Sequence, residues 1–152
     1  MLLTLAFSPC PNDTFIFDAL VNKKIDTEGL DFKVSLEDVE TLNNNAINNQ
    51  FDISKISYGV YHKVMSNYII LDSGSALGTG VGPLLISKEN KNQHKVEDQT
   101  IAIPGENTTA HFLFSMAYPK ATRKIFLKYD EIEKFVEENK GLGVIIHENR
   151  FT

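Results

Sequence analysis

Residues 2–14 read LLTLAFSPCPNDT, and this stretch decides the fold. Its first six residues, Leu2 to Phe7, form an apolar run with the length of a β-strand. Prolines and residues that favour helix N-termini follow at once, so they end the strand and predict a helix that begins at about Asn12 or Asp13. A strand that leads directly into a helix is the first half of a β-α-β unit.

The same alternation continues downstream, with residues 31–36, 51–57 and 68–71 predicted as strands and 39–48 and 58–64 as helices. The first helix places Phe15, Ile16, Ala19 and Leu20 on one face, which we expect to be buried. Regular alternation of strands and helices predicts a doubly wound α/β sheet.

Glycines crowd residues 74–82 and are followed by the apolar run 84–87 and the polar run 88–95, so we place a hinge and a boundary here. A second β-α-β-α-β series is predicted downstream. Its strands are expected at 100–103, 124–129 and 142–146, and its helices at 108–118 and 130–138. The sequence therefore predicts an α/β protein with two lobes, each a sheet flanked by helices. Lobe 1 covers residues 1–87 with the hinge strand, and lobe 2 covers 88–152.

Composition narrows the function classes. Apolar residues make up 42% and charged residues 23% of the chain, as in ordinary globular proteins. A net charge of −5 argues against nucleic acid or an anionic membrane as a partner. Cys10 is the single cysteine, so no disulfide forms within the chain, and no Cys/His cluster has zinc spacing. Without a basic segment before the first strand, and without a long apolar run, we expect a cytoplasmic protein.

Two candidate sites lie beyond strand ends of lobe 1. Ser8, Cys10 and Asn12 follow the first strand, and either Cys10 is a nucleophile near a helix N-terminus or the loop is rigid and faces a substrate. The sequence shows no paired base, which favours the loop. The segment Lys55-Ile56-Ser57 ends the third strand, where Lys55 offers a positive charge and Ser57 a donor, unless this is an ordinary solvated strand end.

Two further candidates lie in lobe 2. The segment Thr108-Thr109-Ala110 begins a helix, and a helix start can bind an anion such as a carboxylate, although plain capping by Asn107 or Thr108 explains the same residues. His147 follows the last strand, at the end of an open sheet where ligands bind, so its imidazole could act as a base. A surface or hydrogen-bonded structural histidine is the alternative.

Three motifs stand out when taken together: FSPCPNDTFIF at residues 7–17, PGENTTA at 104–110 and GLGVIIHE at 141–148. They resemble the 1,4-dihydroxy-6-naphthoate synthase family, which works in menaquinone biosynthesis by the futalosine pathway. The resemblance implies a two-lobed fold like that of type II periplasmic binding proteins. It also implies a chain truncated at its C-terminus, because family members are longer and return to lobe 1 after lobe 2.

The resemblance implies a lyase that splits cyclic dehypoxanthine futalosine into 1,4-dihydroxy-6-naphthoate and a three-carbon fragment. The proton acceptor of the family matches His147, and its substrate contacts match Lys55-Ile56-Ser57 and Thr109-Ala110. No cofactor is expected, and the expected partner is a small-molecule carboxylate. Two alternatives remain: a protein of the same fold that binds a small carboxylate or oxyanion without catalysis, and the sister chorismate dehydratase.

Overall fold

β1 (Leu2–Phe7) is the central strand of the first of two compact units, which covers Met1–Leu77. It pairs in parallel with β2 (Asp31–Leu36) on one side and β3 (Ile53–Ser54) on the other, in the order β2-β1-β3. The computed structural model describes residues 1–88 and 95–146 of the chain. The C-terminal half of β1 is buried, with Leu5 and Ala6 at 0% exposure.

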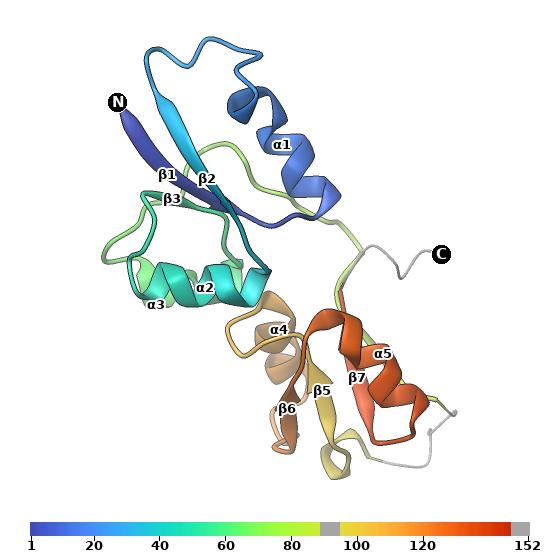
Figure 1. Ribbon diagram of the computed structural model, residues 1–152. Coiled ribbons are helices and arrows are strands. Elements are labelled where there is room, and N and C mark those ends of the chain that lie inside the picture. The colour runs from blue at the N-terminus through green and yellow to red at the C-terminus, as the bar shows by residue number, and fades with distance from the viewer. Residues whose placement is uncertain (89–94, 147–152) are drawn as a thin grey trace. The chain divides into compact units, whose positions relative to one another are not determined.

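The helices α1 (Pro11–Val21) and α2 (Val39–Ile47) connect the strands of this unit as crossovers. The short 3-10 helix η1 (Tyr58–Val60) and α3 (Tyr61–Val64) follow β3. The chain steps from β1 to β2 and then back across β1 to β3, so right-handed crossovers place α1 and α2 on opposite faces of the sheet, as Figure 1 shows. Phe17 of α1 stacks on Phe7 of β1 with ring centroids 4.7 Å apart.

Two expectations for this unit are wrong. Phe15, expected on the buried face of α1, is 85% exposed. Residues 68–71, expected as a strand, form none. A strand needs a partner backbone, and the neighbouring edge strand β3 is only two residues long. Tyr68 is held instead by its hydroxyl, which donates to the Phe51 carbonyl at 2.6 Å.

The second unit, Gly78–Thr152, contains a four-stranded sheet in the order β4-β7-β5-β6. β5, β6 and β7 are parallel, and β4 runs antiparallel to β7. Their bounds are β4 (Leu84–Ile86), β5 (Ile101–Ile103), β6 (Lys124–Phe126) and β7 (Leu142–Ile145). The helical elements are η2 (Val96–Asp98), α4 (Thr109–Ala117) and α5 (Tyr129–Glu137). β4, which we assigned to lobe 1 as a hinge strand, is thus hydrogen-bonded into the sheet of the second unit.

α4 and α5 bury apolar side chains against this sheet. Ala110 and Phe114 of α4 join Ile101, Ile103 and Val144 in one core cluster. A Cβ added at Gly143 would lie 2.6 Å from a methyl group of Ile132 and 2.8 Å from a methyl group of Val136, both on α5. Only glycine therefore lets α5 pack this close to β7.

The predicted α/β class, with sheets flanked by helices, is confirmed. In the described part of the chain, none of the helices combines the length and apolar character that crossing a bilayer requires.

Candidate functional site

Asp13 joins the two predicted strand-end segments of the first unit. Its Oδ2 accepts hydrogen bonds from the Ser8 hydroxyl at 2.8 Å and from the Ser8 N–H at 3.2 Å. Its Oδ1 accepts from Lys55 Nζ at 2.7 Å. Both side chains of the ion pair are largely covered, at 21% exposure for Lys55 and 10% for Asp13. Ser8 and Lys55, which are 47 positions apart in the chain, thus share one carboxylate.

Local structure explains why these residues meet. β1 and β3 are parallel neighbours, so their carboxyl ends lie at the same edge of the sheet. Ser8 follows β1 directly, and the Lys55 N–H donates to the Ala6 carbonyl at 2.8 Å as β3 ends. Pro11 begins α1 and places Asp13 in the first turn, where an acidic side chain favours the positive end of the helix.

Asn43 fixes the third residue of the segment Lys55-Ile56-Ser57. The Asn43 side chain is 0% exposed; its Oδ1 accepts from the Ser57 N–H at 2.8 Å, and its Nδ2 donates to the Ser57 hydroxyl at 3.1 Å. Asn43 is carried by α2, whose N-cap Asp38 accepts from the N–H groups of Glu40 and Thr41. Burial raises the pKa of Asp38, but these hydrogen bonds and one from the Thr41 hydroxyl outweigh burial and lower the pKa overall.

Among the remaining predicted residues of this unit, Cys10 joins the network through its N–H, which donates to the Ser8 hydroxyl at 3.4 Å. Cys10 is the N-cap of α1 and is partly buried, without a side-chain cap bond, and Asn12 is exposed. Ile56 is partly buried.

A hollow of about 380 Å³ lies beside β3 in the first unit. Its walls are mostly apolar and include Phe17, Tyr58 and Tyr68, together with Lys55 and Ile56. Ser8, Asp13 and Ser57 are not among the lining residues. We therefore place the polar chemistry at the strand ends and not in the hollow, with Lys55 at the border between them.

Thr108 caps α4 in the second unit. Its hydroxyl accepts from the His111 N–H at 3.2 Å and donates to the Gly105 carbonyl at 2.9 Å, and Thr108 is 7% exposed. Capping thus explains the Thr108 side chain. Thr109 is partly buried, and Ala110 is 1% exposed and packs into the core, so Ala110 can offer a ligand only its backbone.

The strand that leads to His147 ends at the edge where α4 begins. β5 and β7 are parallel neighbours, with Ile101 opposite Leu142, so their carboxyl ends point the same way. β5 continues through Pro104 and Gly105 to the start of α4. β7 ends at Ile145, and His147 itself lies outside the described residues.

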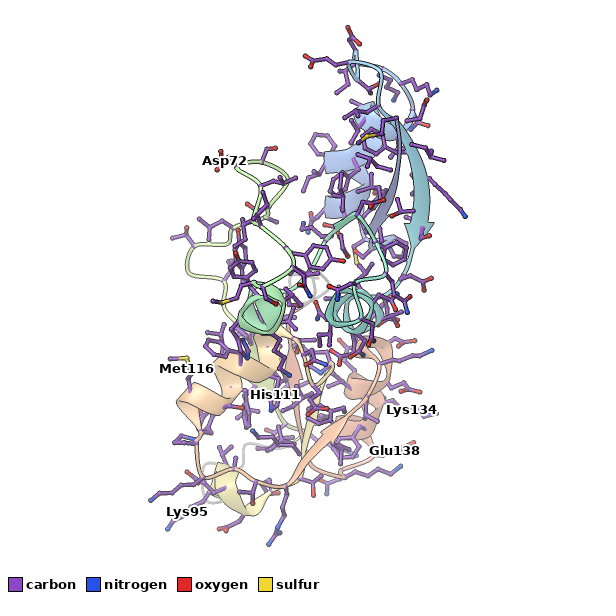
Figure 2. All side chains as sticks on the ribbon, turned by 90° about the vertical axis from the view of Figure 1, so that its left-hand side faces the viewer. Asp72, Lys95, His111, Met116, Lys134 and Glu138 are labelled. Carbon is purple, nitrogen blue, oxygen red and sulfur yellow. The ribbon has the colours of Figure 1, made fainter. Side chains whose placement is uncertain are left out.

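His111, labelled on α4 in Figure 2, is held on both ring nitrogens. Nδ1 lies 2.7 Å from the Glu106 carbonyl oxygen and therefore carries the proton, while Nε2 lies 3.1 Å from Lys124 Nζ and accepts. Lys124 also donates to Ser115 of α4 at 2.7 Å. This cluster joins α4 to β6, and we assign it a structural role.

Asp13 and Asn43 were not predicted from the sequence as residues of the strand-end region. A signal for Asp13 was present, since an acidic residue in the first turn of a helix after one strand can reach a lysine at the end of the parallel neighbour. No comparable signal marks Asn43 within its asparagine-rich helix. Among residues 1–88 and 95–146, no group of three or more His, Cys, Asp or Glu side chains is arranged to hold a metal ion.

Comparisons with known proteins give one consistent result. A family model described as menaquinone biosynthesis matches residues 3–152. Two curated relatives carry the name 1,4-dihydroxy-6-naphtoate synthase. The relative from Thermus thermophilus is 43% identical over 99% of this chain and 54% of its own length. The relative from Streptomyces coelicolor is 36% identical, with the same two shares.

A crystal structure of a protein from Archaeoglobus fulgidus is also similar. It superposes with a TM-score of 0.89 at 32% identity, over 97% of this chain and 55% of that protein. The chain thus spans about half the length of the curated relatives that it matches.

Proposed function

Because this chain belongs to the menaquinone biosynthesis family, we propose that it carries substrate-binding and base-bearing parts of a 1,4-dihydroxy-6-naphthoate synthase. The reaction is the lyase step of the futalosine pathway, in which cyclic dehypoxanthine futalosine is split into 1,4-dihydroxy-6-naphthoate and a three-carbon fragment. A cytoplasmic location and a cofactor-independent mechanism are part of the proposal.

One observation of the structure carries the proposal furthest. The strand that precedes His147 and the helix start Thr108-Thr109-Ala110 lie at the same edge of one parallel sheet. Ligands of open α/β sheets bind beyond such an edge. A helix start favours an anion, so it can orient the carboxylate of a naphthoate.

His147 acts as the general base in this proposal. A neutral imidazole near physiological pH accepts a proton from the sugar-derived ring of the substrate, and the electron pair left behind drives cleavage of the ring bond. General base catalysis contributes about 10²–10⁴-fold, so substrate positioning must supply much of the remaining acceleration.

In the first unit, Lys55 and Ser57 supply donors to polar substrate groups. Ser57 is fixed by Asn43 and Lys55 by Asp13, so both donors are positioned before a ligand arrives. Such preorganisation lowers the entropic cost of binding. Ser8, Cys10 and Asn12 belong to the same strand-end loop, and we propose that this loop faces the substrate.

The test is turnover by a purified protein that carries this sequence, incubated with cyclic dehypoxanthine futalosine and assayed for 1,4-dihydroxy-6-naphthoate. We expect His147→Ala to lower kcat by at least about 10²-fold with a small change in KM. His147→Gln is the matched control, because it keeps a polar side chain but cannot act as a base.

Three outcomes would contradict the proposal. Full turnover by His147→Ala would refute the assignment of the base. Binding of substrate without turnover by the wild type would favour a binding protein, and dehydration of chorismate in the same assay would favour the sister enzyme.

A further inference from the structure

The ion pair between Asp13 and Lys55 sets the kind of ligand group that the first unit can accept. Lys55 Nζ is 2.7 Å from Asp13 Oδ1, and this carboxylate is the only partner that the structure gives to Nζ among the described residues. Asp13 is 7% exposed and receives two further hydrogen bonds from Ser8, so its charge is held in place. The opposite charges of the pair cancel at a distance, although the ammonium keeps donors that can reach a ligand.

An incoming carboxylate would meet both charges. It would be attracted by Lys55 Nζ and repelled by the Asp13 carboxylate close behind it, and partial burial weakens the screening of both effects. An uncharged hydroxyl or carbonyl oxygen would accept the same hydrogen bond without that repulsion. The charge pattern therefore favours an uncharged oxygen at Lys55.

Capping of α1 does not by itself explain this arrangement. An acidic residue in the first helical turn needs only the nearby backbone, which Ser8 N–H supplies. The additional bond to Lys55 joins residues 42 positions apart. A largely buried ion pair is weak evidence for stability, because taking both charges out of water costs about what their attraction returns.

We propose that Asp13 is a positioning and specificity-determining residue. It holds the Lys55 ammonium in an ion pair that has no net charge but still offers hydrogen-bond donors. The first unit therefore accepts the hydroxyl-bearing, uncharged part of the substrate. This inference rests on the proposed function, since it takes Lys55 as a substrate contact.

The test compares two probes of the same shape, 2-naphthoate and 2-naphthalenemethanol, by isothermal titration calorimetry. The readout is the ratio of the two dissociation constants in the wild type and in Asp13→Asn. Neutralising Asp13 leaves Lys55 with an uncompensated charge, so we expect the ratio to shift toward naphthoate by at least about 10-fold. Naphthoate binding should also become more sensitive to salt.

Asp18→Asn is the matched control, because it also replaces a carboxylate of α1 by an amide, but Asp18 pairs with Lys24 and not with Lys55. It should leave the ratio unchanged even if the melting temperature falls. Asp13→Glu restores the charge and should restore the wild-type ratio. Should Asp13→Asn not fold, Asp13→Ser provides a second uncharged variant for the same measurement.

An unchanged ratio in the uncharged variants would overturn the inference, and equal weakening of both probes would assign Asp13 a purely structural role. Loss of turnover in His147→Ala together with an unchanged ratio would leave the proposed function standing without this inference. Failure of the wild type to bind either probe would contradict the inference, whereas turnover of cyclic dehypoxanthine futalosine decides the proposed function separately.

Discussion

The residues at the strand ends of the two units are held by different kinds of contact. In the first unit, side chains far apart in sequence meet: Ser8, Asp13 and Lys55 share one buried network with balanced charges. In the second unit, the helix start is organised by a local cap, in which the Thr108 hydroxyl bonds to residues three positions away. A charge-balanced network selects uncharged polar groups, whereas a helix start with its dipole favours anions.

The largest expected loss of stability comes from breaking the network of the first unit. Lys55→Met removes the ammonium and leaves the Asp13 carboxylate largely buried without its charged partner. Removing one partner of a buried ion pair costs about 3–5 kcal/mol, and partial exposure of Lys55 reduces this to about 2–3 kcal/mol. Urea denaturation measures the difference. A double variant, Lys55→Met with Asp13→Asn, should recover most of the lost stability, and no recovery would mean that the pair is not coupled.

A second change tests the packing beneath the site of the second unit. Gly143→Ala places a Cβ within 3 Å of methyl groups of Ile132 and Val136. Overpacking of this kind costs about 1–3 kcal/mol, which thermal denaturation detects. Gly80→Ala is a useful contrast, because nothing lies within 4 Å of its added Cβ and only its positive φ of 70° opposes the change. Equal losses from the two variants would argue against close contact of α5 with β7.

The cap of the second unit should matter less than the network of the first. Thr108→Ala removes the hydroxyl that accepts from the His111 N–H, and loss of an N-cap costs about 1 kcal/mol. Thr108→Ser keeps the hydroxyl and should cost much less. If Thr108→Ala were as damaging as Lys55→Met in urea denaturation, the contrast between the two strand ends would fail.

The smallest effect is a dependence of stability on pH. The Thr4 N–H and hydroxyl donate to Asp52, and these bonds lower the pKa of Asp52 from 3.8. A carboxyl whose folded pKa lies below its unfolded pKa contributes stability above the unfolded value and loses it as pH falls through the folded value. Acid titration of the melting temperature should therefore show a drop below about pH 4 in the wild type. Asp52→Asn should show a smaller drop, and an identical one would exclude the contribution of Asp52.

The comparison of the strand ends also shows what the sequence could reveal. The bounds of β1 and β2 were predicted to the residue, because apolar runs and alternation are local signals. The Thr108 cap was likewise among the alternatives that sequence allowed. The network around Asp13 was missed, since it depends on two parallel strands ending side by side, which only the fold determines.

The failed expectations have the same cause. Residues 68–71 have the composition of a strand, but pairing depends on a neighbouring backbone, and β3 offers an edge of two residues. Phe15 follows a helical stripe, yet the face of α1 that meets β1 is the one that carries Phe17. In both cases tertiary contacts, which no single stretch of sequence encodes, decided the outcome.

Lys55 itself gives the most direct test of the central claim, that its ammonium is charge-balanced and takes an uncharged oxygen. Nuclear magnetic resonance of protein with labelled lysine side chains can follow the Lys55 signals during titration with 2-naphthalenemethanol and with 2-naphthoate. We predict that the alcohol shifts the Lys55 signals in the wild type, and that naphthoate does so only when Asp13 is replaced by Asn. Shifts of Lys55 by naphthoate in the wild type, at least as large as those caused by the alcohol, would contradict the account.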